Sequence, residues 1–125
     1  MMKIGKISQI AIPVSNLETS MAFYGKTLGL PLLFRADPGM AFFDIEGLRL
    51  MLSEAEEVSP IGPSGPILYF STPDIAAAWK DLTAAGAEMI REPQMTHKTD
   101  DTELWLAFFK DPDGHTLALM EERAI

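Results

Sequence analysis

The sequence predicts an α+β fold in which two tandem βαβββ modules form curved, barrel-like mixed sheets with helices on their outer face. Three observations lead to this prediction. Residues 9–29 align with residues 67–86, Phe42-Phe43-Asp44 aligns with Phe108-Phe109-Lys110, and in both copies a short apolar strand pattern runs into a helical one. Self-similarity over units this long indicates a duplicated supersecondary module within one domain rather than a solenoid.

The first module begins with an apolar strand pattern over residues 9–14. The Ser-x-x-Glu signal at 15–18 then predicts a helix capped by Ser15, and apolar residues on one helical face continue it to Gly29, which ends it. Turn-forming residues separate the strands that follow. These strands are predicted at 31–36, 40–45 and 48–53.

The second module follows a stretch rich in Pro and Gly at residues 55–65, which predicts a linker between modules 1–54 and 66–125 of a single domain. Thr72 is predicted as the helix cap and Pro73 as the first helical residue. A polar loop at 92–102, which contains His97, is predicted where the first module has a tight turn. The strands of this module are predicted at 67–72, 88–91, 104–110 and 115–121.

Composition narrows the class of protein. A length of 125 residues with 47% hydrophobic content is that of one globular domain. No segment approaches the roughly 20 apolar residues of a membrane span, and no signal-peptide pattern is present, so we expect a cytoplasmic protein with no membrane partner. The net charge of -8 argues against a nucleic-acid partner. It favours a cationic ligand where acidic groups surround a cleft, and otherwise indicates a solvated surface.

Alternation along the strands predicts which side chains face the helices and which face away. Leucines, isoleucines, Val14 and Phe70 occupy the positions that lie beneath the helices. The opposite face mixes an apolar wall with a few polar groups, which is typical of a small-molecule cavity. Its members are Gln9, Ala11, Arg49, Met51, Ser53, Ile67, Tyr69, Ser71, Thr116, Ala118 and Met120.

The paired modules, the run of residues 17–24 before Leu28-Gly29-Leu30, and the Asp111-Pro112-Asp113-Gly114 turn resemble the vicinal oxygen chelate superfamily. This superfamily includes glyoxalase I, bleomycin-resistance proteins and extradiol dioxygenases. Residues 49–53 and 104–109 are similar to its small, functionally unassigned glyoxalase-like branch. The resemblance covers nearly the whole chain and implies the fold rather than an activity, because this fold hosts unrelated chemistries. It also implies a homodimer.

Enzymes of this superfamily hold a divalent ion with ligands from the first and last strands of each module, and the resemblance places those positions at Gln9, Met51, Ile67 and Ala118. The amide oxygen of Gln9 can bind a hard cation. The Met51 thioether suits soft ions, and the hydrocarbon side chains of Ile67 and Ala118 cannot bind a metal ion. We therefore predict no metal cofactor at these positions. The alternative is a divalent metal, with Gln9 as a weak candidate ligand or with ligands placed elsewhere.

The resulting prediction is a small-molecule-binding protein in the manner of the bleomycin-resistance branch, with a cationic compound as the suggested ligand. The alternative is an enzyme of lyase, isomerase or dioxygenase type, either metal-free or with a non-standard metal site. His115 and Tyr69 are its candidate acid-base residues, since each can exchange a proton with a substrate. The predicted ligand contacts are Gln9, Arg49, Met51, Ile67, Tyr69, Ser71, Trp105 and Ala118.

Overall fold

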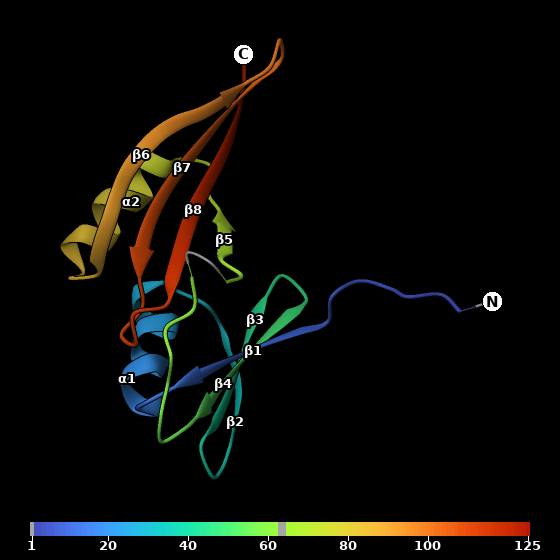
Figure 1. The fold of residues 1–125 in the computed structure, drawn as a ribbon, viewed down its shortest axis with the longest axis vertical. Coiled ribbons are helices and arrows are strands. Elements are labelled where there is room, and N and C mark those ends of the chain that lie inside the picture. Colours follow the sequence, from blue (N-terminus) through green and yellow to red (C-terminus); the bar gives the residue numbers. More distant parts are fainter. Residues whose placement is uncertain (1, 63–64) are drawn as a thin grey trace. The chain divides into compact units, whose positions relative to one another are not determined.

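The computed structural model describes residues 2–62 and 65–125. It divides into two compact units, the first ending at Val58 and the second beginning at Ser59. This boundary lies within the predicted linker, so each unit contains one copy of the repeat (Figure 1). That the two copies make a single domain remains a prediction. None of the helices among the described residues is long and apolar enough to cross a lipid bilayer.

The first unit is a four-stranded sheet with one helical segment. Its strand order is β1-β4-β3-β2, in which β1 runs parallel to β4 and the other neighbours are antiparallel. Helix α1 packs against β3 and β4 and continues directly into a π-helical turn, η1. The elements are β1 (Gln9–Val14), α1 (Leu17–Ala22), η1 (Phe23–Thr27), β2 (Leu32–Ala36), β3 (Met40–Ile45) and β4 (Leu48–Glu54).

The second unit repeats this topology. Its strand order is β5-β8-β7-β6, β5 runs parallel to β8, and α2 packs on β6, β7 and β8. The predicted fold class, an α+β fold of two βαβββ modules with mixed sheets and helices on one face, is confirmed. Each sheet keeps two edge strands and does not close on itself. The elements are β5 (Leu68–Ser71), α2 (Ile75–Ala84), β6 (Glu88–Lys98), β7 (Thr102–Lys110) and β8 (Thr116–Ala124).

The cores agree with the predicted alternation. In the first unit Ile12, Leu50 and Leu52 are buried, and in the second unit Leu117 and Leu119 are buried. These side chains alternate along their strands with the residues that were placed on the opposite face. The helices therefore cover the leucine-rich face of each sheet.

Both predicted helix caps were wrong by one or two residues. The N-cap of α1 is Asn16, whose side-chain oxygen accepts a hydrogen bond from the Thr19 amide at 3.0 Å, and not Ser15. The N-cap of α2 is Asp74, which accepts from the Ala77 amide at 3.1 Å, so Thr72 and Pro73 precede the helix. Asn and Asp are favoured caps because their short side chains reach the free amides of the first turn.

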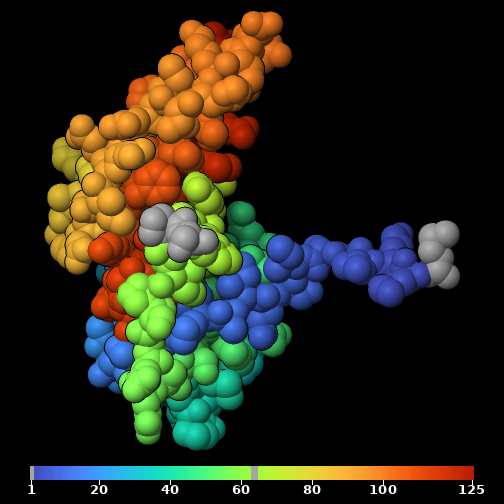
Figure 2. Space-filling model, viewed as in Figure 1, coloured from blue at the N-terminus to red at the C-terminus, as the bar shows by residue number. Residues whose placement is uncertain are grey.

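The predicted polar loop at 92–102 was also wrong. Strand β6 continues to Lys98 and pairs with β7 in a long hairpin that projects from the rest of the second unit (Figure 2). β6 is the edge of its sheet and is mostly exposed, so polar residues occupy both of its faces and the alternation that marks a half-buried strand is lost. A turn closed by Thr99 and Thr102, whose hydroxyls lie 2.9 Å apart, joins the two strands.

Candidate ligand-binding site

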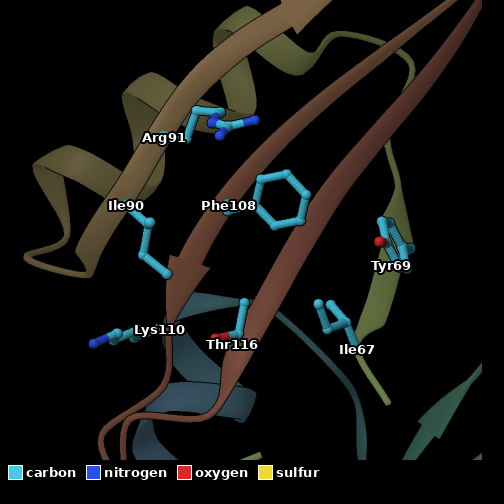
Figure 3. A pocket seen from close by; sticks show the side chains of 7 residues that line it. All are labelled: Ile67, Tyr69, Ile90, Arg91, Phe108, Lys110 and Thr116. Carbon is cyan, nitrogen blue, oxygen red and sulfur yellow. The ribbon is translucent and has the colours of Figure 1, made fainter. Parts of the chain in front are cut away.

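A pocket lies on the face of the second sheet that is turned away from α2 (Figure 3). Its volume is about 410 Å³, within the range of about 300–1,000 Å³ that is usual for small-molecule sites. All four strands of the sheet, or the residues that lead into them, contribute to the wall. The lining residues are Ile67, Tyr69, Ile90, Arg91, Phe108, Lys110 and Thr116.

Strand register explains why these residues meet. Phe108 on β7 stands opposite Ala118 on β8, and Ala118 in turn stands opposite Tyr69 on β5. Directly paired residues share a face of the sheet. Ala118 has no exposed surface, and the rings of Phe108 and Tyr69 lie edge to face with centroids 6.2 Å apart. Ala118 therefore lies between two aromatic residues that line the pocket, and it is not itself a lining residue.

A β-bulge brings two consecutive residues, Ile90 and Arg91, to the same pocket. The register between β6 and β7 shifts between Met89 and Arg91, and Arg91 then pairs with Phe108. A bulge places an extra residue on one strand and so interrupts alternation. For this reason the alternation pattern in the sequence could not place either residue at the site.

The charged groups of the pocket are cationic. The guanidinium carbon of Arg91 lies 5.9 Å from the centre of the Phe108 ring, within cation-π range. The ammonium of Lys110 lies 3.5 Å from a carboxylate oxygen of Glu88, and its side chain extends away from Phe108 at the edge of the group (Figure 3). No carboxylate is among the described lining residues. An apolar cavity with positive charge at its edge is suited to a negatively charged group.

The predicted contact residues of the first unit share one face of its sheet. Gln9 places its amide nitrogen 3.9 Å from the sulfur of Met51. The guanidinium carbon of Arg49 lies 5.8 and 5.6 Å from the ring centres of Phe34 and Phe42, which stack with centroids 4.5 Å apart. Arg49 thus rests on aromatic rings and, within the described part of the chain, has no carboxylate at ion-pair distance.

Of the predicted contacts in the second unit, Ile67 and Tyr69 line the pocket, whereas Ala118 pairs with Tyr69 and is outside the lining. Ser71, at the end of β5, is exposed and outside the lining. Trp105 donates a hydrogen bond from Nε1 to Glu103 at 3.1 Å and carries Arg123 at 4.3 Å over its ring, also outside the lining. The binding roles of all these residues remain predictions.

Sequence reasoning missed Phe108, Lys110, Ile90 and Arg91 as site residues. A usable signal existed for the first two, because Phe108 and Lys110 repeat Phe42 and Asp44 of the first module, and Phe42 pairs with Met51 on the predicted cavity face. Extending the cavity face to the third strand of each module would have identified Phe108. No signal in the sequence marked the bulge.

His115 is buried beside the turn before β8. Its Nδ1 atom accepts a hydrogen bond from the backbone N–H of Ile61 at 3.0 Å, which leaves the ring proton of the neutral imidazole on Nε2. Only 1% of the residue is exposed, and it is not among the pocket residues. The imidazole links two backbone segments, and its predicted acid-base role is untested.

Asp111, Asp113 and His115 form a cluster whose candidate ligand atoms lie within 4.8 Å of one another, and such a set could hold a metal ion. Asp111 also closes the turn. Its Oδ1 atom accepts hydrogen bonds from the amides of Asp113 and His115, both at 2.9 Å, and its Oδ2 atom lies 4.0 Å from Nε2 of His115. An ion bound to Oδ1 of Asp111 would compete with the hydrogen bonds that shape the turn.

Equivalent glutamates attach each helix to the last strand of its module. Glu54 at the end of β4 accepts a hydrogen bond from the first amide of α1, at Leu17, and Glu121 in β8 accepts from the first amide of α2, at Ile75. Both distances are 2.7 Å. A hydrogen bond from Arg123, and then the Ile75 amide, hold the pKa of Glu121 below its usual value.

Residues 6–119 match the family described as Glyoxalase/Bleomycin resistance protein/Dioxygenase superfamily. The chain belongs to this superfamily. The predicted resemblance is therefore confirmed, and it extends over nearly the whole sequence.

Superfamily relatives include a protein named Metallothiol transferase FosB from Lysinibacillus sphaericus, 27% identical over 91% of this chain and 80% of its own length. An uncharacterized protein of Mycolicibacterium smegmatis is 31% identical over 70% of this chain and 73% of its own. A crystal structure of a superfamily member from Sphaerobacter thermophilus has a TM-score of 0.76 at 26% identity and covers 94% of this chain and 98% of that one.

The four superfamily ligand positions do not fit a divalent metal in this member. In the first unit, Gln9 offers one amide and Met51 a thioether. In the second unit, Ile67 is part of the apolar pocket wall and Ala118 is completely buried. Hard and borderline divalent ions need several oxygen or nitrogen donors. Only Gln9 carries one.

Proposed function

We propose that this protein binds a small organic molecule in the pocket of its second unit, without a metal at the four superfamily positions. The observation that carries the proposal is the pocket itself, about 410 Å³ in volume, in which an apolar wall surrounds the Phe108 ring and a few polar groups stand at the edge. A cavity of this size and lining is what a drug-sized ligand needs for burial and orientation.

The lining also favours binding over covalent chemistry. Among the described pocket residues, the side chains with polar atoms are Tyr69, Arg91, Lys110 and Thr116, and none of these four donates a hydrogen bond to an activating base. A hydroxyl or amine nucleophile requires such a base or a strongly lowered pKa. Binding without turnover is the simplest use of this set of residues.

The second candidate is a metal-dependent enzyme. Two relatives, 27% and 29% identical to this chain, are named metallothiol transferases, and the Asp111, Asp113 and His115 cluster offers donors of suitable type. Against it stand the hydrogen bonds that Nδ1 of His115 and Oδ1 of Asp111 already accept, and the hydrocarbon side chains at Ile67 and Ala118. The lyase, isomerase and dioxygenase alternatives also need a catalytic site with suitable metal ligands or acid-base residues.

The test begins with elemental analysis of the purified chain, followed by an NMR screen of small molecules with the isotope-labelled protein. Binding to the pocket moves the amide signals of Tyr69, Arg91 and Phe108. Ile90→Ala should lower the affinity of any such ligand by about threefold to tenfold, since it removes apolar wall. Met95→Ala, on the same strand but outside the pocket, is the matched control.

Two results would overturn the proposal. One is stoichiometric metal whose removal by EDTA abolishes a measured reaction. The other is a screen in which no compound moves the pocket signals, or in which Ile90→Ala and Met95→Ala have equal effects on affinity.

A further inference from the structure

The charge of the pocket differs from that of the chain. The chain carries 18 acidic and 10 basic residues, whereas the charged residues in the described pocket lining are Arg91 and Lys110. The carboxylate of Glu88 contacts Lys110 at 3.5 Å and is outside the lining. A ligand in this pocket therefore meets a positive local field inside a negatively charged protein.

Arg91 differs from two other arginines of the chain. Arg35 pairs with Glu18 and Asp37, and Arg123 pairs with Glu121 at 2.6 Å. Arg91 lies against the Phe108 ring, and among the described residues no carboxylate comes within 4.0 Å of its guanidinium. Its planar fork of N–H donors matches the two oxygens of a carboxylate.

Apolar groups lie next to this cation. The Phe108 ring is in the middle of the lining in Figure 3, with Ile67 and Tyr69 on one side and Ile90 on the other. They offer a surface for a hydrocarbon or aromatic body beside the charged group. Burial of that body would also exclude water from the guanidinium, which strengthens its interaction with an anion.

We infer that the pocket takes a small carboxylate with an apolar or aromatic body, the carboxylate on Arg91 and the body against Phe108. Lys110, shared with Glu88, adds positive field at the rim. This inference rests on the proposed binding function and names its ligand class. It opposes the expectation of a cationic ligand, which came from the charge of the whole chain and not of the pocket.

The experiment compares three probes with one aromatic body and different charge: phenylacetate, phenylacetamide and phenethylamine. Each is titrated into the isotope-labelled full chain, and the amide signals of the pocket residues report binding. We expect phenylacetate to bind about tenfold or more tightly than the neutral amide, and the amine to bind more weakly still. Added salt should weaken the binding of phenylacetate far more than that of the amide.

Arg91→Gln should lower the affinity for phenylacetate by about tenfold and leave that for the amide unchanged. Arg91→Lys should recover part of the loss, because charge returns without the bidentate geometry. Lys80→Gln makes the same charge change on α2, on the other face of the sheet, and should have little effect. Thermal unfolding of each variant confirms that it is folded.

The outcomes separate this inference from the proposed function. Equal affinities for phenylacetate and phenylacetamide, with the pocket signals moving for both, would overturn the inference that the ligand is a carboxylate. The proposed binding function of the pocket would still stand. The carboxylate inference also fails if Arg91→Gln lowers the affinity for phenylacetate no more than Lys80→Gln does. If no probe moves the pocket signals, the inference fails, and the wider screen described above decides the fate of the proposed function.

Discussion

His115 accepts a hydrogen bond at Nδ1 from the Ile61 amide at 3.0 Å, and the Ile61 carbonyl accepts a second hydrogen bond from the backbone N–H of the next residue, Thr116, at 2.9 Å. Thr116 is a pocket residue. The buried imidazole thus fixes the start of β8 against the segment that leads into β5, and with it one wall of the pocket.

Removing the imidazole should destabilise the protein. His115→Ala leaves the Ile61 amide without its acceptor and opens a cavity, and we expect a loss of roughly 2–4 kcal/mol in the free energy of unfolding. Urea denaturation measures it. His97→Ala, on the exposed part of β6, is the control and should change stability by less than about 0.5 kcal/mol. Equal effects of the two substitutions would show that the link between His115 and Ile61 contributes nothing.

Gly62 is constrained by its backbone and by Thr116. Its φ is +88°, and a Cβ there would lie 3.0 Å from Cβ of Thr116. Gly86, after α2, has a φ of +87° with open space around it. Gly86→Ala should therefore cost about 1–2 kcal/mol for the left-handed backbone alone. Gly62→Ala should cost clearly more and shift the NMR signals of Thr116. If Gly86→Ala proves the more destabilising of the two, the close contact is unimportant.

Glu121 should make the free energy of unfolding depend on pH in the acidic range. Its folded pKa lies below the unfolded value of 4.5, so the unfolded chain takes up the proton first. The stabilisation is complete above pH 4.5 and is lost as the pH falls through the folded pKa. Urea denaturation between neutral and acidic pH should show a weaker pH dependence for Glu121→Gln than for the parent. The neighbouring exposed Glu122→Gln serves as the control, and a parallel set of curves for all three proteins would contradict the assignment.

The Asp111, Asp113 and His115 cluster can be tested for metal directly. Because Oδ1 of Asp111 and Nδ1 of His115 already accept hydrogen bonds, we expect Zn²⁺ or Mn²⁺ to change the Tm of the parent no more than that of Asp113→Asn. A ligand that binds only the folded state raises Tm by linkage. A rise seen in the parent and lost in Asp113→Asn would establish a metal site at this turn and favour the enzyme alternative.

Much of the architecture could be read from local patterns. The repeat located both modules, and alternation correctly assigned Ile12, Leu50 and Leu117 to the buried faces. It also put Ile67 and Tyr69 on the face that carries the pocket. These assignments succeeded because the pattern of a half-buried strand depends only on which neighbours in the chain are apolar.

The errors have a common origin in interactions between distant residues. The sequence predicted only the start of β6, at 88–91. The polar remainder of this strand, up to Lys98, gave no strand signal, since its order comes from pairing with β7. The caps moved to Asn16 and Asp74 because the tertiary positions of the helices, held by Glu54 and Glu121, set where the first free amides lie. Neither glutamate stands near its helix in the sequence.

The internal repeat and the strand alternation thus predicted the duplicated sheet-and-helix plan of this superfamily member, and the family resemblance assigned the four ligand positions to Gln9, Met51, Ile67 and Ala118. Only the tertiary structure determined which residues form the pocket wall. It also determined the bulge that places Arg91 beside Phe108, and the burial of His115. Side-chain identity is written along the chain, whereas register, bulges and hydrogen bonds between remote segments depend on cooperative pairing across the whole sheet.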